Sequence, residues 1–246
     1  IGPGSVRGDD PPTPYAALAF CPMTNTSQPL RRLAGAAFIA APFLMVGGMV
    51  TSPPQDSDAP IDYVRSLGAD FGLTVLSADL FHYAWVLIAL ALPAVLTLLR
   101  GPKGRGLTTV AVVLAAFGAI QMSGLLLSDW FNGAAATTVP IGDATRILET
   151  VSADPSLTVW RLTGVVLGVG ALPLVVAGLA RAGVLGWWAV PLLFLPMVAA
   201  PMLPGVAGPV AALLCYSPLV LIGLRLIRRS APEVVAAEQV VSPAHA

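Results

Sequence analysis

Long apolar stretches separated by shorter polar segments dominate the sequence after residue 30. A helix needs roughly 20 apolar residues to cross the hydrocarbon core of a bilayer. Six stretches come close to that length or exceed it, which predicts an all-α polytopic transmembrane bundle of about six spans. The predicted spans are 33–51, 73–99, 107–127, 157–180, 185–203 and 207–227.

The composition supports a lipid environment. Hydrophobic residues make up 56% of the chain and charged residues 11%, whereas a soluble domain carries about 25% charged residues. The mean hydropathy is +0.82, so the lipid bilayer is the expected partner. The net charge is +0 and no basic stripe is present, which gives no indication of nucleic-acid binding.

Charges in the connecting segments alternate between basic and acidic along the chain. Cytoplasmic segments of membrane proteins collect Lys and Arg, so we expect both termini to be cytoplasmic and two longer loops to lie outside a bacterial plasma membrane. The basic segments hold Arg31, Arg32, Arg100, Lys103, Arg105, Arg181, Arg225, Arg228 and Arg229. The acidic segments hold Asp56, Asp58, Asp62, Asp70, Asp129, Asp143, Glu149 and Asp154, with only three arginines.

The two ends of the chain lack the pattern of a span. We expect residues 1–30 to form a disordered N-terminal tail and 230–246 a disordered cytoplasmic tail, which leaves 31–229 as the transmembrane domain. Met23 opens a segment typical of a natural start, so 1–22 are interpreted as an over-extended gene model or a disordered tail. Cys21 lies in the polar tail and Cys215 in an apolar stretch, which argues against a disulfide between them.

The last two predicted spans are rich in proline. An interior proline removes a backbone hydrogen bond and kinks a helix. One interpretation is a bent hairpin with a tight Pro-Gly turn, and the other is a broken helix that lines a cavity. The prolines are Pro191, Pro196, Pro201, Pro204 and Pro209.

The two predicted outer loops resemble each other. "PIDYVRSLGADFGLTV" covers 60–75 and "PIGDATRILETVSADPSLTV" covers 140–159. The shared order Pro-Ile, Asp-x-x-Arg-x-Leu and Ala-Asp-x-x-Leu-Thr-Val predicts a tandem repeat of spans 1–2 and 3–4, with chance similarity as the alternative.

The repeated residues have a structural interpretation. We expect each loop to contain a short surface helix capped by Asp62 or Asp143, with Arg65 or Arg146 one turn further on. Asp70 and Asp154 then become the N-caps of the second and fourth spans, with Pro155 at the first helical position.

Four ionisable residues are predicted to lie in one layer near the outer edge of the bilayer. Asp79 and His82 are three residues apart, and so share a helix face, while Asp129 and Arg161 fall at a similar depth on neighbouring spans. One hypothesis is a structural collar in which Asp79 or Asp129 pairs with Arg161. The other is a proton-coupled or small-solute site open to the outside. Only three ligands would be available to a metal, and His245 is too far along the chain, so no metal or cofactor is predicted.

Weaker signals lie in the third and fourth spans. Gly164 and Gly168 form a GxxxG pattern that favours close helix packing. Gln121 and Ser123 are candidates for hydrogen bonds between helices or for the lining of a pore. The sequence contains no P-loop, GxSxG, HExxH or Rossmann fingerprint, so no catalytic residue is assigned.

The layout and the "DYVRSLGAD" loop resemble uncharacterised six-span integral membrane proteins of high-GC bacteria. The resemblance covers about residues 30–229 and implies the fold but no activity. We therefore expect a structural, accessory or sensing membrane protein, with a membrane-protein partner or a second copy left open. The alternative is a transporter with a cavity that reaches Asp79 and His82.

Overall fold

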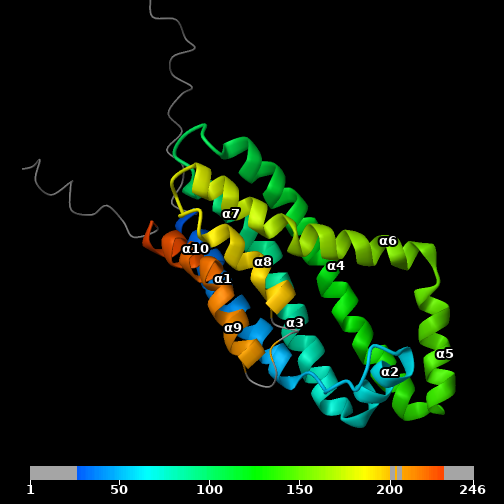
Figure 1. The fold of residues 1–246 in the computed structure, drawn as a ribbon. Coiled ribbons are helices and arrows are strands. Elements are labelled where there is room, and N and C mark those ends of the chain that lie inside the picture. Colours follow the sequence, from blue (N-terminus) through cyan, green and yellow to red (C-terminus); the bar gives the residue numbers. More distant parts are fainter. Residues whose placement is uncertain (1–26, 200–202, 204–206, 230–246) are drawn as a thin grey trace, which may run out of the picture.

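The computed structural model describes residues 27–199, 203 and 207–229 (Figure 1). This part of the chain is helical with short connections and contains no strand, so the predicted all-α class is confirmed. The predictions for 1–22 and 230–246, and those for Cys21 and His245, fall outside the described residues. Helix α1 (Ser27–Thr51) begins a few residues earlier than the predicted end of the N-terminal tail.

Four helices or helix runs are long and apolar enough to cross a membrane, as predicted for spans one to four. The first is α1. The second joins α3 (Phe71–Ala91) to the 3₁₀ segment η2 (Leu92–Leu98), and the third is α4 (Arg105–Thr138). The fourth joins α6 (Pro155–Thr163), the π-helical segment η3 (Gly164–Val169) and α7 (Ala171–Arg181).

The two further spans predicted in the last third of the chain are not confirmed in the described residues. Helix α8 (Ala189–Ala199) has 11 residues, which is about 17 Å and only about half of a bilayer core. Helices α9 (Ala207–Cys215) and α10 (Ser217–Arg228) make a fifth span only if the pair is taken together across a 41° bend. The expected Pro-Gly turn lies mostly outside the described residues.

The bend between α9 and α10 has a local cause. Pro218 stands in the first turn of α10. Its ring cannot donate a backbone hydrogen bond and collides with the carbonyl of the preceding turn, so a continuous helix is disfavoured there.

The two predicted outer loops contain short helices. They are α2 (Pro60–Ala69) and α5 (Ile141–Ser152). Helix α4 continues to Thr138 instead of ending near 127, and its 34 residues span about 51 Å, longer than a bilayer core. Small residues permit this extension, because Gly133 packs against Phe71 and Ala136 packs against Gly68.

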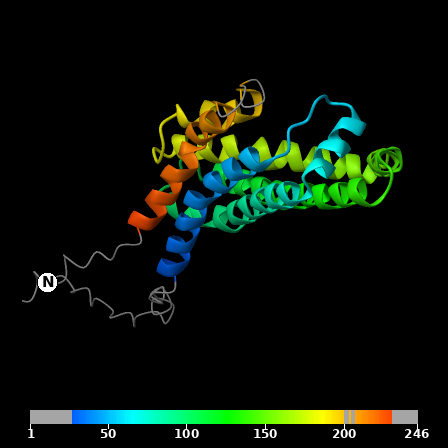
Figure 2. The ribbon, with the colours of Figure 1, turned by 90° about the horizontal axis from the view of Figure 1, so that it is seen from below.

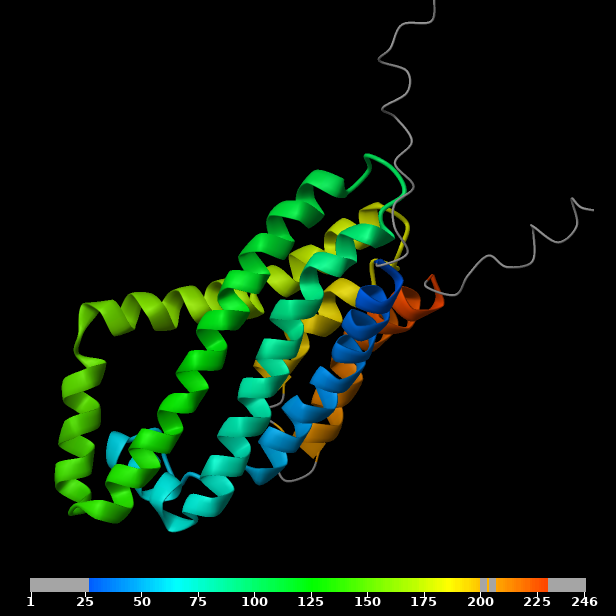
Figure 3. The ribbon, with the colours of Figure 1, turned by 180° about the vertical axis from the view of Figure 1, so that it is seen from behind.

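The helices pack as a bundle at one end and diverge at the other. Helix α1 packs against α3 and α10, α3 packs against α4, and α4 packs against η3 and α7. Figure 3 shows that α4, α5 and α6 form three sides of a triangle beyond this bundle. The core lies in the bundled part and includes the fully buried side chains of Phe38, Ile88, Leu92, Leu179, Ile222 and Leu226.

Charged residues separate to the two ends of the molecule. Arg31 donates a hydrogen bond to the Arg229 carbonyl at 3.1 Å, so the beginning of α1 and the end of α10 meet, while α2 and α5 lie at the far end (Figure 2). We call the first the basic end; it contains Arg31, Arg32, Arg100, Lys103, Arg105, Arg181, Arg225, Arg228 and Arg229. All nine acidic residues of the described chain lie in the opposite half, called the acidic end.

Glycines bring α4 and η3 into backbone contact. A Cβ added at Gly118 would collide with the backbone N of Gly168, and one added at Gly168 would lie 2.9 Å from the Gly118 carbonyl oxygen. Gly164 lies against the side chains of Gln121 and Leu125 of α4. The close packing predicted from the GxxxG pattern is therefore confirmed.

Candidate functional site

Asp79 and His82 lie on α3, but the structure gives them different surroundings. The His82 ring faces α4, where its Nδ1 is 2.8 Å from the Ser123 hydroxyl oxygen. The partly exposed Asp79 makes no hydrogen bond or ion pair with any described residue. His82 is therefore an interhelical contact, whereas the Asp79 carboxyl remains available to a solvent molecule or a ligand.

Asp129 faces α2 instead of the other three residues of the predicted layer. The Tyr63 hydroxyl donates a hydrogen bond to its carboxylate. Burial and the neighbouring Asp129 charge raise the pKa of Tyr63 well above its usual range, so the phenol stays a donor. The sequence did not indicate Tyr63, although Tyr63 and the buried Leu67 share one face of α2.

Arg161 lies on α6, and its side chain is exposed. It acts on the Tyr63 phenol electrostatically, but no ion pair within 4.0 Å joins it to Asp79 or Asp129 in the described part of the chain. The expected collar salt bridge is therefore not formed. The physical reason is the direction of the side chain: Trp160 and Thr163 contact α4, whereas the side chain of Arg161 between them is exposed.

Further polar contacts join the long helices at a similar level. Gln121 donates from Nε2 to the Thr163 hydroxyl at 3.3 Å, and Ser77 donates to the Gly48 carbonyl at 2.9 Å. The prediction that Gln121 and Ser123 bond between helices is confirmed. Together with Tyr63–Asp129 and His82–Ser123, these contacts join α1, α2, α3, α4 and α6 through polar groups.

The residues of the two similar loops are arranged alike. Asp62 pairs with Arg65 at 2.6 Å and Asp143 with Arg146 at 2.9 Å, both across three residues of a helix. The aspartates are not the caps that were predicted. Ala59 and Pro140 occupy the cap positions, and the acids lie in the first turn, where they interact favourably with the helix dipole.

The predicted caps of the second and fourth spans are confirmed. The Asp70 side chain accepts a hydrogen bond from the backbone N–H of Leu73 at 3.0 Å. The Asp154 side chain accepts one from Ser156 at 2.7 Å, and this bonding lowers the pKa of Asp154. The same order of surface helix, aspartate cap and span thus occurs twice, while the tandem repeat itself stays a prediction.

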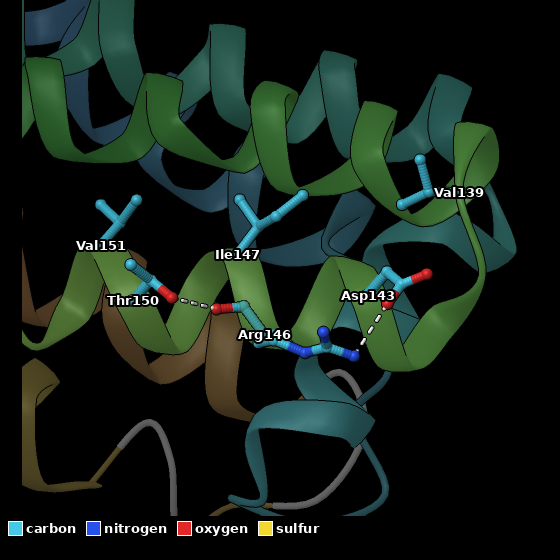
Figure 4. A pocket seen from close by; sticks show the side chains of 6 residues that line it. All are labelled: Val139, Asp143, Arg146, Ile147, Thr150 and Val151. Atoms are coloured by element: carbon cyan, nitrogen blue, oxygen red, sulfur yellow. Dashed lines mark hydrogen bonds and ion pairs between the residues drawn. The ribbon is translucent and has the colours of Figure 1, made fainter.

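A shallow hollow of about 340 Å³ lies between the end of α4 and α5. Val139, Ile147 and Val151 point into it, and the Asp143–Arg146 ion pair lies at one edge (Figure 4). Its remaining lining residue is Thr150. The hollow is mainly apolar, and it is separate from Asp79 and His82.

The segment that runs from this hollow back to the bundle is weakly packed. Helix α6 contains no buried residue, and α5 buries only Ala144 and Thr145. We call residues 141–163 the α5–α6 arm. Its exposed apolar side chains include Ile147, Val151, Val159 and Leu162.

Within the described ranges, no group of three His, Cys, Asp or Glu side chains could hold a metal ion. Comparison of the chain with models of known protein families, with curated proteins and with solved structures gives no match.

Proposed function

We propose that the chain is a structural or accessory protein of a bacterial cell membrane that binds a membrane-protein partner through the α5–α6 arm. The observation that supports this most strongly is the absence of any buried residue in α6. A helix in a packed bundle normally buries one face. An arm with exposed Val159 and Leu162 is suited to contact with a surface that another molecule supplies.

Two features favour a protein helix over lipid chains as the occupant. The exposed apolar residues continue from α6, which lies within a candidate span, to Ile147 and Val151 on α5, which lies outside it. Lipid chains can cover the apolar residues of α6, but they do not reach those of α5, which lies outside the candidate span. Arg161 and Glu149 are also exposed on the arm without an ion pair among the described residues, and they offer charges that a partner helix can complement.

The proposal includes the orientation of the chain. We place the basic end in the cytoplasm, because cytoplasmic segments collect Lys and Arg. The arm then lies at the outer face of the plasma membrane. In this proposal the chain passes the membrane six times, with α8 and the α9–α10 pair as a shortened last hairpin, and the surface helices α2 and α5 belong to a duplicated unit.

Photo-crosslinking in native membranes tests the partner proposal. A photoreactive amino acid is placed at Val151 or Leu162, which are 52% and 63% exposed, and at Val113, which is 64% exposed on α4. We expect one discrete protein adduct from the two arm positions and only lipid adducts from Val113. Substitution Ile147→Glu should remove the adduct. No protein adduct, or the same adducts from all three positions, would contradict the proposal.

A second candidate function is supported by Asp79. A partly exposed carboxyl on a candidate span, with no partner among the described residues, is costly unless it has a role. The alternative is an outward-facing transporter for protons or a small solute. It requires that Asp79→Asn abolish uptake while the folded protein remains stable, and unchanged uptake would exclude the role of Asp79.

A further inference from the structure

The basic end contains a cluster of arginines that we call the arginine cluster: Arg31, Arg100, Arg225 and Arg229. They come from the first turns of α1, the connection after η2 and the end of α10. Figure 3 shows the beginning of α1 beside the end of α10. None of the nine acidic residues in the described chain lies at this end.

Backbone contacts bring this cluster together. A Cβ added at Gly35 would lie 2.7 Å from the Gly223 carbonyl oxygen, so α1 and α10 touch through their backbones. Arg31 is one turn before Gly35 and therefore meets the end of α10. The arginines at the contact are held in place, because Arg31 donates to the Arg229 carbonyl and Arg229 donates to the Leu98 carbonyl at 2.6 Å.

Within the described residues the cluster has no acidic counter-charge, and one of its donors has no acceptor. The Nε atom of Arg31 is buried and has no hydrogen-bond partner, and a buried donor left in this state is costly. Burial and the positive charges of Arg100, Arg225 and Arg31 lower the pKa of Arg229. Guanidinium groups within electrostatic reach of one another favour the binding of an anion.

We propose that the arginine cluster binds the phosphate of an anionic phospholipid headgroup between the beginning of α1 and the end of α10. The position of the cluster at the ends of α1 and η2, both parts of candidate spans, matches the depth of a lipid headgroup. Basic pockets between membrane helices bind such headgroups, whereas isolated exposed cations only report orientation. Arg31 is placed by its hydrogen bond to the Arg229 carbonyl, and the planar fork of a guanidinium group suits phosphate oxygens.

Lipid titration of the purified full chain tests this site. Three samples are compared. The first is the protein in phosphatidylcholine nanodiscs, the second is the protein in nanodiscs that also contain phosphatidylglycerol, and the third is the protein in phosphatidylcholine nanodiscs with added inorganic phosphate. Lipid binding is measured by native mass spectrometry and by the shift in unfolding temperature. We expect phosphatidylglycerol to bind at least about tenfold more tightly than phosphatidylcholine.

Arg100 and Arg225 are the positions to change, because their side chains make no hydrogen bond with another described residue. The double variant Arg100→Gln/Arg225→Gln should bind phosphatidylglycerol about 25-fold more weakly, since each cation near a membrane surface contributes about fivefold. The matched control is Lys103→Gln/Arg181→Gln, which removes the same charge from a separate hollow at the basic end. The control should keep most of the affinity.

Variants that keep the positive charge distinguish a specific phosphate site from general electrostatic attraction of anionic lipid. Arg100→Lys/Arg225→Lys should lose part of the affinity, because lysine lacks the planar fork. The proposal is overturned if the control loses as much as the cluster variant, or if phosphatidylglycerol and phosphatidylcholine bind equally. An equal effect of inorganic phosphate would assign the cluster to a free anion and would also overturn the lipid proposal.

Discussion

The close approach of α4 and η3 predicts that Gly118→Ala damages the fold. The added Cβ would meet the backbone N of Gly168 rather than a side chain that could rotate away. Even the milder contact from Gly168, at 2.9 Å, falls about half an ångström short of ordinary van der Waals separation. The two helices must therefore separate along their shared length and lose packing on both sides.

The size of the effect follows from two opposing terms. Alanine gains about 1 kcal/mol of helix propensity over glycine, whereas overpacking against backbone costs about 3 kcal/mol or more. We expect a net loss of about 2 kcal/mol or more in the free energy of unfolding. For a chain of this length that lowers the unfolding temperature by about 4–8 °C.

Thermal unfolding of the purified protein in detergent, followed by tryptophan fluorescence, measures this loss. The matched control is Gly106→Ala on the same helix, where an added Cβ meets nothing within 4 Å. The control should be unchanged or up to about 1 kcal/mol more stable. Equal unfolding temperatures for the Gly118 and Gly106 variants would refute the backbone contact between α4 and η3.

Three further outcomes follow from the polar residues. Tyr63→Phe should cost about 1–3 kcal/mol in thermal unfolding, because it leaves the partly buried Asp129 carboxyl without its donor; a neutral result would contradict that contact. Asp154→Ala should increase amide exchange in the first turn of α6. The pKa of Asp154 is lowered in the folded chain, so its stabilising contribution is present above the ordinary carboxyl range and is lost as the pH falls through the folded-state pKa. The amide exchange of variant and wild type should therefore converge in acid. Asp79→Asn should be neutral or stabilising whereas His82→Leu should lower the unfolding temperature, since only His82 has a partner among the described residues; equal losses would contradict this assignment.

Local patterns in the sequence predicted the long helices well. The start of α3 at Phe71 follows from Asp70, whose cap is formed by residues next to it in the chain. The sequence likewise predicted Asp154 as the cap and Pro155 as the first residue of α6 from neighbouring residues alone. Apolar length predicted the four long spans because that property requires no knowledge of neighbouring helices.

Contacts between distant segments limited the prediction elsewhere. Helix α4 continues to Thr138 through Ala and Thr residues that lack the signal of a span, because Gly133 and Ala136 pack against α3 and α2. The apolar pattern of 185–203 likewise predicted a full span, whereas the described helix α8 has 11 residues.

The sequence predicted how deep in the bilayer the residues of the candidate site lie, but not which side chains contact one another. Depth along each span placed Asp79, His82, Asp129 and Arg161 in one layer, but the direction of each side chain depends on helix rotation. Asp129 consequently pairs with Tyr63, a residue 66 positions away in the chain. Arg161 makes no ion pair with these acids, because its side chain is exposed while its neighbours Trp160 and Thr163 contact α4.

The separation of charges to two ends of a membrane-spanning bundle is tested most directly by labelling single cysteines in sealed cells. In a background with Cys21→Ser and Cys215→Ser, cysteines replace Ser57 or Glu149 at the acidic end and Lys103 or Arg181 at the basic end, all of them exposed. A membrane-impermeant maleimide should label the first pair in intact cells and the second pair only after permeabilisation. Labelling of all four positions from the same side would contradict the account.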